Sequence, residues 1–292
     1  MPGLASEFGS DMEVVHTKTE LQAILQTYRQ KQETIGFVPT MGALHAGHLA
    51  LVKACREQAT RTVVSIFVNP VQFNDPQDFA LYPRTLDEDL QLLEAHQADV
   101  VFVPKEKEIY PEGTAHLEAY DLGPLESVLE GAYRPGHFQG VARVMRRLLE
   151  RIQPDVLIMG EKDYQQCLIV QKLLQMMDLP VRFYMHPTVR EADGLAMSSR
   201  NRRLSAADRK KATLIYESLM YIRSQWRHMP FDKLRGIVGE QLLAAGFAID
   251  YVVIARSADL QILQAPEDTA MRALIAAKIG GVRLIDNMPI HP

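Results

Sequence analysis

The chain has little cysteine, no long apolar run and no excess of positive charge. Its 292 residues include only 2 cysteines, Cys55 and Cys167, in no metal-binding spacing, which favours free buried thiols in a reducing, cytoplasmic setting. No run of about 18 apolar residues exists, so no transmembrane helix or membrane partner is expected. The net charge of -4 creates no field that attracts polyanions, which argues against a nucleic-acid-binding protein.

What remains is the composition of an ordinary globular protein. Hydrophobic residues make up 47% and charged residues 23% of the chain, and its length suits one large domain with a smaller one. Residues 1–11 lack the basic start and apolar core of a signal peptide. We interpret them as a vector-derived leader before a native Met12 and exclude them from the fold.

Short apolar runs alternate with helical patterns from about residue 34 to residue 185. Strands separated by helices form βαβ units with right-handed crossovers, so the sequence predicts an α/β fold with a doubly wound, mostly parallel sheet of Rossmann-like type. The expected strands are Thr34–Val38, Thr62–Val68, Asp99–Val103, Asp155–Met159 and Val181–Met185. The expected helices are Gly47–Ala59, Leu86–His96, Val141–Ile152 and Gln165–Met177.

The pattern changes after Pro187. One long helix is expected over Ser205–Trp226, with Ser205 as its N-cap, and a shorter helix over Phe231–Ala244. The glycine pair at 280–281 predicts a two-residue hairpin turn. The chain therefore divides into a Rossmann-like domain over 12–187 and a smaller α+β domain over 188–292. The strands expected in the smaller domain are Ile249–Ala255, Thr269–Ile279 and Val282–Asn287.

Two histidines open the helix that follows the first strand. The apolar run over 35–38 ends at Pro39, a glycine-bearing turn follows, and His45 and His48 stand three residues apart. A helix N-terminus offers unpaired N–H groups and partial positive charge, and residues three apart share one face. The pattern indicates a grip on a nucleoside triphosphate, with Gly42 and Gly47 letting the backbone approach the ligand. A purely structural histidine pair is the competing interpretation, and zinc lacks a third ligand.

A second polar block follows the strand that ends at Met159. Lys162 can neutralise phosphate charge, Asp163 can help to hold Mg²⁺ or orient a ribose, and Gln166 can bind a small polar substrate. Taken alone, the segment is as well explained by a charged surface turn. Its place at the carboxyl edge of the predicted sheet favours a ligand-binding role.

A glycine-containing loop over 187–201 joins the two predicted domains. It combines the hydroxyls of Ser198 and Ser199 with the guanidinium of Arg200, as a flexible phosphate clamp does. A solvated linker between domains has a similar composition, so the loop alone does not decide the function.

A further strand ends in amide side chains. Asn69 and Gln72 can hydrogen-bond a ligand that carries a carboxylate or hydroxyl, or they can simply cap a turn. The segment over 74–85 that follows is equally consistent with a mobile lid and with an ordinary surface loop.

In this order and at these spacings, the blocks resemble the pantothenate synthetase (pantoate–β-alanine ligase) family, of the HxGH nucleotidyltransferase-like superfamily. The family pattern contains PTMGxLHxGH, FVNPxQF, YPRTLxxD, LEGxxRPGHFxGV, GEKDxQQ, PTVREADGLAxSSRN and RLIDN. The chain carries these motifs between Met12 and Pro289.

The resemblance implies an ATP-dependent ligase that forms pantothenate from pantoate and β-alanine through a pantoyl adenylate, releasing AMP and pyrophosphate. It also implies a cytoplasmic homodimer whose C-terminal domain covers the site. Mg²⁺ is expected to arrive with the nucleotide, because no carboxylate cage of a dedicated metal site is visible.

The resemblance also implies a role for each matching residue. The residues expected at the reacting phosphates are His45, His48, Lys162, Ser198, Ser199 and Arg200. ATP binding falls to Met41, Gly47, His48, Gly160, Lys162, Asp163, Val189, Met197, Ser198, Ser199 and Arg200. Pantoate and β-alanine binding falls to Met41, Asn69, Gln72 and Gln166.

Departures from the family pattern lie outside these positions and leave local packing and substrate affinity open. The departures are Gln139, Ala142, Arg143, Arg147, Met159 and Val282.

Two other functions compete with this interpretation. Another HxGH nucleotidyltransferase or a class I aminoacyl-tRNA synthetase is the alternative enzyme, although the acidic chain and small C-terminal domain offer little to tRNA. A non-catalytic nucleotide-binding protein is expected to have lost His48, Lys162 or Arg200, and all three are present.

Overall fold

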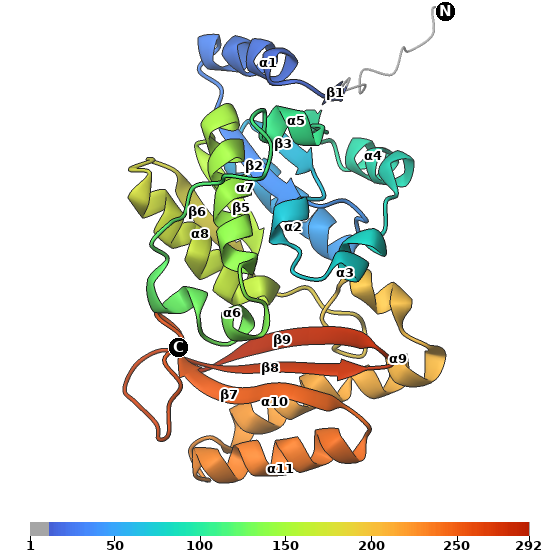
Figure 1. Ribbon diagram of the computed structural model, residues 1–292, viewed down its shortest axis with the longest axis vertical. Coiled ribbons are helices and arrows are strands. Elements are labelled where there is room, and N and C mark those ends of the chain that lie inside the picture. Colours follow the sequence, from blue (N-terminus) through green and yellow to red (C-terminus); the bar gives the residue numbers. More distant parts are fainter. Residues whose placement is uncertain (1–11, 292) are drawn as a thin grey trace, which may run out of the picture.

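The computed structural model describes residues 12–291, so the predicted leader lies outside the described part of the chain. A parallel sheet of six strands, in the order β1-β4-β3-β2-β5-β6, forms the larger part, and an antiparallel sheet of three strands, β7-β8-β9, forms the smaller part (Figure 1). The predicted α/β class with an appended α+β unit is confirmed.

The elements follow one another in βα alternation through the large sheet. Its strands are β1 (Glu13–Val15), β2 (Ile35–Thr40), β3 (Arg61–Ile66), β4 (Val100–Phe102), β5 (Val156–Gly160) and β6 (Arg182–His186). Its helices are α1 (Lys18–Gln30), α2 (Ala46–Gln58), α3 (Pro76–Ala80), α4 (Leu86–Ala95), α5 (Glu106–Ile109), α6 (Glu130–Tyr133), α7 (His137–Ile152) and α8 (Tyr164–Met176). Short 3₁₀ turns are η1 (Pro70–Gln72), η2 (Gly123–Glu126), η3 (Glu161–Asp163) and η4 (Ser199–Arg203).

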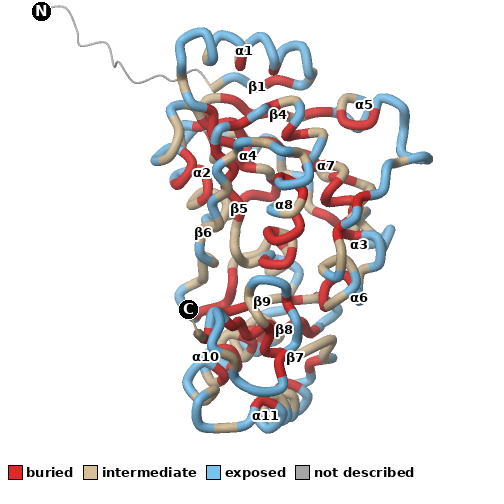
Figure 2. The backbone as a smooth tube through the Cα atoms, turned by 90° about the vertical axis from the view of Figure 1, so that its left-hand side faces the viewer, coloured by how far each residue is buried: buried red, intermediate tan, exposed pale blue. Residues whose placement is uncertain are grey.

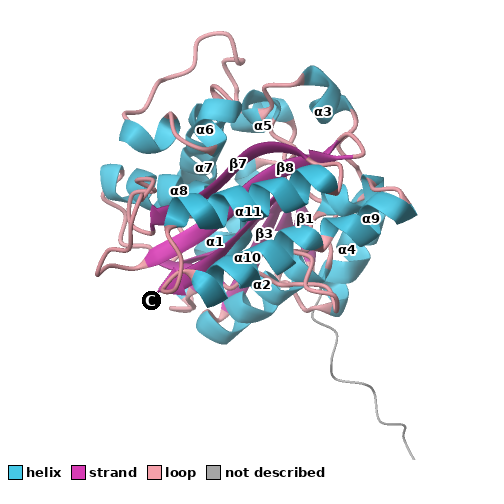
Figure 3. Ribbon diagram, turned by 90° about the horizontal axis from the view of Figure 1, so that it is seen from below, coloured by secondary structure: helices cyan, strands magenta, loops and turns pink. Residues whose placement is uncertain are grey.

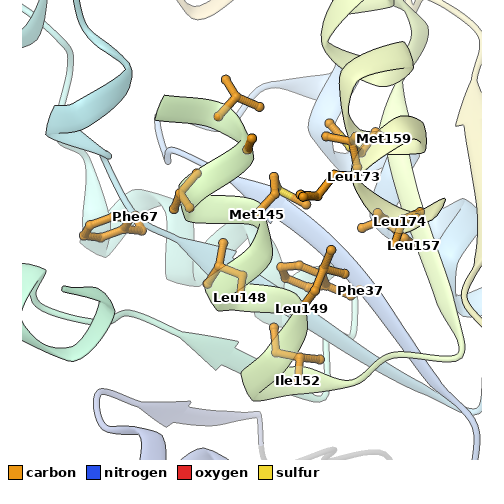
Figure 4. Close-up of a cluster of buried hydrophobic side chains, with 14 of the residues drawn as sticks. Phe37, Phe67, Met145, Leu148, Leu149, Ile152, Leu157, Met159, Leu173 and Leu174 are labelled. Carbon is orange, nitrogen blue, oxygen red and sulfur yellow. The ribbon is translucent and has the colours of Figure 1, made fainter. Parts of the chain in front are cut away.

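Both faces of the large sheet are covered by helices. Phe37 and Leu157 point to one face, where they pack with α7 and α8 residues such as Leu149 and Leu173 (Figure 4). Val38, next to Phe37 in β2, points to the other face and belongs to a second core with α2 and α4. The alternation of strand side chains between two apolar layers explains why the strands read as continuous hydrophobic runs.

The strand order reverses direction between β2 and β5. From β2 the chain adds β3 and then β4 on one side, and it later adds β5 and β6 on the other side. The crevice at the carboxyl ends of strands that flank such a switch point is where open α/β sheets bind ligands. The loops after β2 and β5 carry the two predicted polar blocks, so the topology brings them to one place.

The expectation that the first strand ends at Pro39 was wrong, because β2 continues to Thr40. The Phe67 N–H donates to the Thr40 C=O at 3.1 Å, so the backbone groups of Thr40 and of every second residue before it face β3. Pro39 therefore faces the β5 side, where strand pairing stops at Phe37. Its missing N–H breaks no bond of the ladder.

The smaller unit places helices on one face of its sheet. The strands are β7 (Ala248–Arg256), β8 (Met271–Ile279) and β9 (Val282–His291), and α10 (Leu214–Gln225) and α11 (Phe231–Ala244) cover the face away from the large sheet (Figures 1 and 3). Gly280 and Gly281 have φ of +55° and +76°, so the predicted hairpin turn is confirmed.

The single long helix predicted over 205–226 was wrong. Ser205 caps α9 (Ala206–Ala212) as expected, but α9 ends at Ala212, Thr213 interrupts the helix, and α10 begins at Leu214. The Thr213 hydroxyl donates to the Lys210 C=O at 3.0 Å. Such a local side-chain bond competes with the regular helical ladder and accounts for the interruption.

Burial follows this layered plan. Buried stretches run through the interior of both units, whereas α1 and α11 present mostly exposed outer faces (Figure 2). Cys55 and Cys167 are buried free thiols, as predicted. Among the described residues, no helix has the length and apolarity that crossing a membrane requires.

Candidate active site

A cavity of about 220 Å³ opens at the carboxyl ends of β2, β3 and β5. It lies at the switch point of the sheet and is closed on one side by the loop after β6. Every residue to which the sequence gave a catalytic or binding role lines this one cavity, whereas Gly42, expected to let the backbone approach the ligand, does not line it and instead packs against Asp89 and Ile66. The lining residues with such a role are Met41, His45, Gly47, His48, Asn69, Gln72, Gly160, Lys162, Asp163, Gln166, Val189, Met197, Ser198, Ser199 and Arg200.

The turn that delivers the histidines is held by a buried carboxylate from α4. Asp89 is 2% exposed and accepts the N–H groups of Ala43 and Leu44 at 2.8 and 2.7 Å. Gly42 and Ala43 have φ of +76° and +50°, which is a costly conformation for Ala43. Asp89 thus stabilises a strained turn immediately before His45. The sequence reasoning missed this residue, and its only signal was the last position of the YPRTLxxD motif.

His45 is the N-cap of α2 as well as a wall of the cavity. Its Nδ1 accepts the Gly47 N–H at 3.1 Å, which leaves the ring proton of the neutral imidazole on Nε2. A Cβ on Gly47 would lie 2.8 Å from the His45 ring. Residue 47 must therefore be glycine for the His45 ring to take this position, independently of whether Gly47 also lets a ligand approach the backbone. The structural and the ligand-binding interpretations of His45 are compatible.

Both imidazoles of the turn are neutral at pH 7. Burial lowers the pKa of His45 to about 4 and that of His48 to about 3, and the Lys162 ammonium acts in the same direction. The rings lie 4.1 Å apart, and His48 Nδ1 is buried without a hydrogen-bond partner among the described residues. Neutral rings can donate N–H groups to phosphate oxygens without adding charge of their own.

The turn after β5 presents Lys162 and is fixed by the C-terminal unit. The Asn287 amide of β9 donates to the C=O groups of Glu161 and Lys162 at 3.0 and 2.9 Å. Arg272 of β8 is bonded to the Glu161 carboxylate. Within residues 12–291, the Lys162 ammonium itself has only the Asp163 carboxylate as an ion-pair partner, at 3.7 Å. The backbone of this turn is thus restrained while the cation remains available to a ligand.

One end of the cavity, here called the amide end, carries the Asn69 and Gln72 side chains and is built by buried hydrogen bonds. Asn69 donates to Gln72 Oε1 at 3.1 Å and accepts from the Tyr110 hydroxyl at 2.8 Å. His137 Nδ1 donates to the Gln72 C=O at 2.8 Å. A Cβ at Gly140 would lie 2.5 Å from Gln72 Cα, so α7 can approach only with glycine there. The sequence reasoning quoted the RPGHF motif but assigned no role to its histidine.

The third loop reaches the cavity from the opposite side. Ser198 caps η4, Ser199 is buried, and Arg200 donates to Asp78 of α3 at 2.7 Å. The segment over 74–85 therefore forms a short helix that contacts Arg200, which the sequence left undecided. Arg190, earlier in the same loop, forms a bidentate pair with Asp286 of β9.

The departures from the family pattern hardly touch the cavity, since only Met159 lines it. Arg143 and Arg147 bind Glu118, and Gln139 bonds to Tyr120, so these three tie α7 to the preceding loop. Ala142 and Val282 are buried in the two cores.

We expect acidification to destabilise the fold through His137. Burial, with Arg134 adding to it, lowers the pKa of His137 from 6.5 to about 4. Between these values the unfolded chain binds a proton that the native ring does not, so stability falls as pH drops from about 6.5 to 4. The full shift corresponds to on the order of 3 kcal/mol.

Thermal unfolding of the wild type and of His137→Asn at pH 7 and pH 4.5 tests this expectation. Asparagine can still donate to the Gln72 C=O. The variant should lose less stability on acidification than the wild type, and an identical loss would contradict the assignment. His45 and His48 act with the same sign, so some pH dependence should remain.

Comparison with known proteins agrees with this geometry. The sequence pattern of the family described as pantoate-beta-alanine ligase matches residues 13–289. A pantothenate synthetase of Methylococcus capsulatus is 44% identical over 96% of this chain and 98% of its own length. One of Thioalkalivibrio sulfidiphilus is 45% identical over the same shares.

Solved structures agree as well. The pantothenate synthetase of Thermus thermophilus has a TM-score of 0.89 and 42% identity, covering 96% of this chain and 100% of that one. The ligase of Francisella tularensis, complexed with beta-gamma ATP and beta-alanine, has a TM-score of 0.80 and 36% identity, covering 96% and 98%. The chain belongs to the pantoate–β-alanine ligase family and is a ligase that uses ATP to form pantothenate from pantoate and β-alanine.

Proposed function

We propose that the cavity at the β2–β5 switch point carries out both steps of this ligation, with the histidine turn and Lys162 at the triphosphate and the amide end at pantoate. The observation that carries the proposal is that one cavity joins these groups from three strand ends. In the first step a pantoate carboxylate oxygen attacks the α-phosphorus. The bond to the bridging oxygen breaks, and pyrophosphate leaves.

The charges around the cavity suit this first step. The Lys162 ammonium and the Arg200 guanidinium screen the repulsion between the carboxylate and the phosphates, and the neutral His45 and His48 rings donate hydrogen bonds to phosphate oxygens. Ser198 and Ser199 complete the clamp. Binding of ATP would require Arg200 to exchange part of its contact with Asp78 for phosphate.

The nucleoside and pantoate occupy the remaining wall. Gly47, Gly160, Val189 and Met197 would contact the adenosine, and Asp163 its ribose. The amides of Asn69, Gln72 and Gln166 would hold the hydroxyls or carboxylate of pantoate, with Met41 between the two ligands.

In the second step the amine of β-alanine attacks the acyl carbon of the pantoyl adenylate. A C–N bond forms, the acyl–oxygen bond to AMP breaks, and the amine releases a proton. Enclosure by the C-terminal unit, which already contacts the Lys162 turn through Asn287, would protect the reactive adenylate from water.

Mg²⁺ fits this site only as an ion that is bound to ATP and enters with it. Residues 12–291 contain no group of three or more His, Cys, Asp or Glu side chains that could hold a metal ion. The half-exposed Asp163 carboxylate beside Lys162 would contact a nucleotide-bound ion. The bound ion would neutralise charge on the leaving pyrophosphate.

Two further proposals rest on the family and not on a contact within the chain. We propose that the protein acts as a homodimer and that it works in the cytoplasm. The division into a nucleotide- and pantoate-binding domain over 12–187 and a covering domain over 188–292 is likewise our proposal, supported by their separate cores.

A coupled assay of AMP release tests the proposed reaction. With ATP, Mg²⁺ and pantoate present, AMP should be released over many turnovers only when β-alanine is added. Omitting β-alanine should leave a pantoate-dependent exchange of labelled pyrophosphate into ATP, because adenylation is reversible. Absence of both signals would contradict the proposal, and AMP release without pantoate would indicate a different acceptor.

A further inference from the structure

Arg134 stands where three cavities meet, and within the described part of the chain it has no carboxylate partner. It lines the main cavity, a second one that extends toward the C-terminal unit and a small third one between the first turns of α7 and α8 and the C-terminal sheet. No ion pair of Arg134 exists within residues 12–291. Neither the histidine turn nor any predicted role above involves it.

The other arginines that line these cavities are all paired. Arg200 and Arg203 share Asp78, at 2.7 and 3.0 Å. Arg283 binds Glu130 and Asp250, each at 2.7 Å. Glu130, the carboxylate closest in sequence to Arg134, is therefore occupied by Arg283 and also by the Tyr251 hydroxyl. Within residues 12–291, Arg134 is left as the one guanidinium of the group without an ion-pair partner.

The side chain of Arg134 is nevertheless held in place. It stands in the turn between α6 and α7, where its N–H donates to the Glu130 C=O at 2.8 Å. Its guanidinium lies 3.1 Å from His137 Nε2, which can accept because Nδ1 of that ring donates to Gln72. Burial lowers the pKa of Arg134, and Arg200 and Arg283 add to this, whereas the Glu130 and Asp163 carboxylates act in the opposite direction without forming an ion pair with it. A partly buried, oriented guanidinium without an ion-pair partner is a receptor for an anion.

The chemistry of the substrates selects which anion this is. The triphosphate already has Lys162, Arg200 and the histidine turn. The carboxylate of pantoate is consumed, because it becomes the acyl phosphate and then the amide. The carboxylate of β-alanine is the one that stays free and ionised from binding to product. Arg134 lies on the side of the cavity where the Asn69 and Gln72 amides are proposed to bind pantoate. One hydrogen bond links it to His137, and a second links His137 to the Gln72 C=O.

From this geometry we infer that Arg134 binds the carboxylate of β-alanine and orients its amine toward the acyl carbon. The inference rests on the proposed function. It assigns Arg134 to the second step alone, and it makes an amino acid with a free carboxylate the preferred acceptor over an uncharged amine. A forked guanidinium suits this task because it can bind both carboxylate oxygens.

The test compares Arg134→Gln with the wild type in both half-reactions. The variant should raise the KM for β-alanine by about 30-fold or more, the effect expected when a buried charge pair loses one partner. The KM values for ATP and pantoate, and the pantoate-dependent pyrophosphate exchange, should change little. The preference for β-alanine over β-alaninamide should fall by a similar factor, and Arg134→Lys should restore part of it.

Arg203→Gln is the matched control, since Arg203 lines the second cavity but is already paired with Asp78. It should leave the KM for β-alanine unchanged. If Arg134→Gln does not fold, the preference for β-alanine over the amide measured in Arg134→Lys decides the question. An equal loss of pyrophosphate exchange, or an unchanged preference, would overturn the inference. Absence of exchange in the wild type would instead refute the proposed function.

Discussion

Replacement of Lys162 by alanine should lower the rate of adenylate formation by about 10²- to 10³-fold, the usual effect of removing one preorganised donor at a developing charge. The ammonium lines the cavity at the end of β5, and its one ion-pair partner within residues 12–291 is Asp163, at 3.7 Å. The other cation assigned to the phosphates, Arg200, is already paired with Asp78, so Lys162 supplies the readily available charge when negative charge moves from the α-phosphate to pyrophosphate.

The same substitution should hardly change stability. The structural contribution of residue 162 comes from its C=O, which accepts from Asn287 and remains in the alanine variant. Pyrophosphate exchange and thermal unfolding, measured side by side, separate the two effects. Lys53→Ala, on the exposed face of α2, serves as the control and should change neither. A fall in the melting temperature in proportion to activity would indicate a structural lysine.

Replacement of Asp89 by alanine should damage both stability and activity. The substitution leaves the N–H groups of Ala43 and Leu44 buried without acceptors, at a cost of about 1–3 kcal/mol for each group. It also releases a turn whose Ala43 has an unfavourable φ of +50°. Because His45 follows this turn directly, the rings should lose their placement, and pyrophosphate exchange should fall by at least about tenfold.

Two variants sharpen this expectation. Asp89→Asn keeps one acceptor and should lie between the wild type and the alanine variant in melting temperature. Asp87→Ala removes an exposed carboxylate from the first turn of the same helix, α4, and should have little effect. Full activity in Asp89→Ala at a temperature where it is folded would show that the turn does not need this support.

Local patterns predicted most of the elements. The alternation of apolar runs located β2 to β6, and the glycine pair located the hairpin between β8 and β9. Sequence reasoning placed no element before residue 34, although Thr17 and Glu20 form a capping box at the start of α1. It also ended β2 too early, because the tolerance of Pro39 depends on which neighbouring strand it faces.

The chemistry-bearing side chains were predictable because the reaction demands particular groups in fixed local motifs. The residues that support them were not predictable in the same way. Asp89 reaches a turn 45 and 46 positions earlier in the chain, and Asn287 reaches a turn 125 and 126 positions earlier. Spacing along the chain carries no information about such contacts, which exist only after the sheet and the C-terminal unit pack together.

The sequence by itself determined the fold class, the family and the set of groups that face the substrates, since periodicity, turn chemistry and motif order are local properties. Only the tertiary structure decided that β2 and β5 are neighbours, that the histidines are partly buried and neutral, and that Arg134 forms no ion pair within residues 12–291 while the neighbouring arginines do. Burial and ion pairing depend on distances between segments remote in the chain, and folding alone sets those distances.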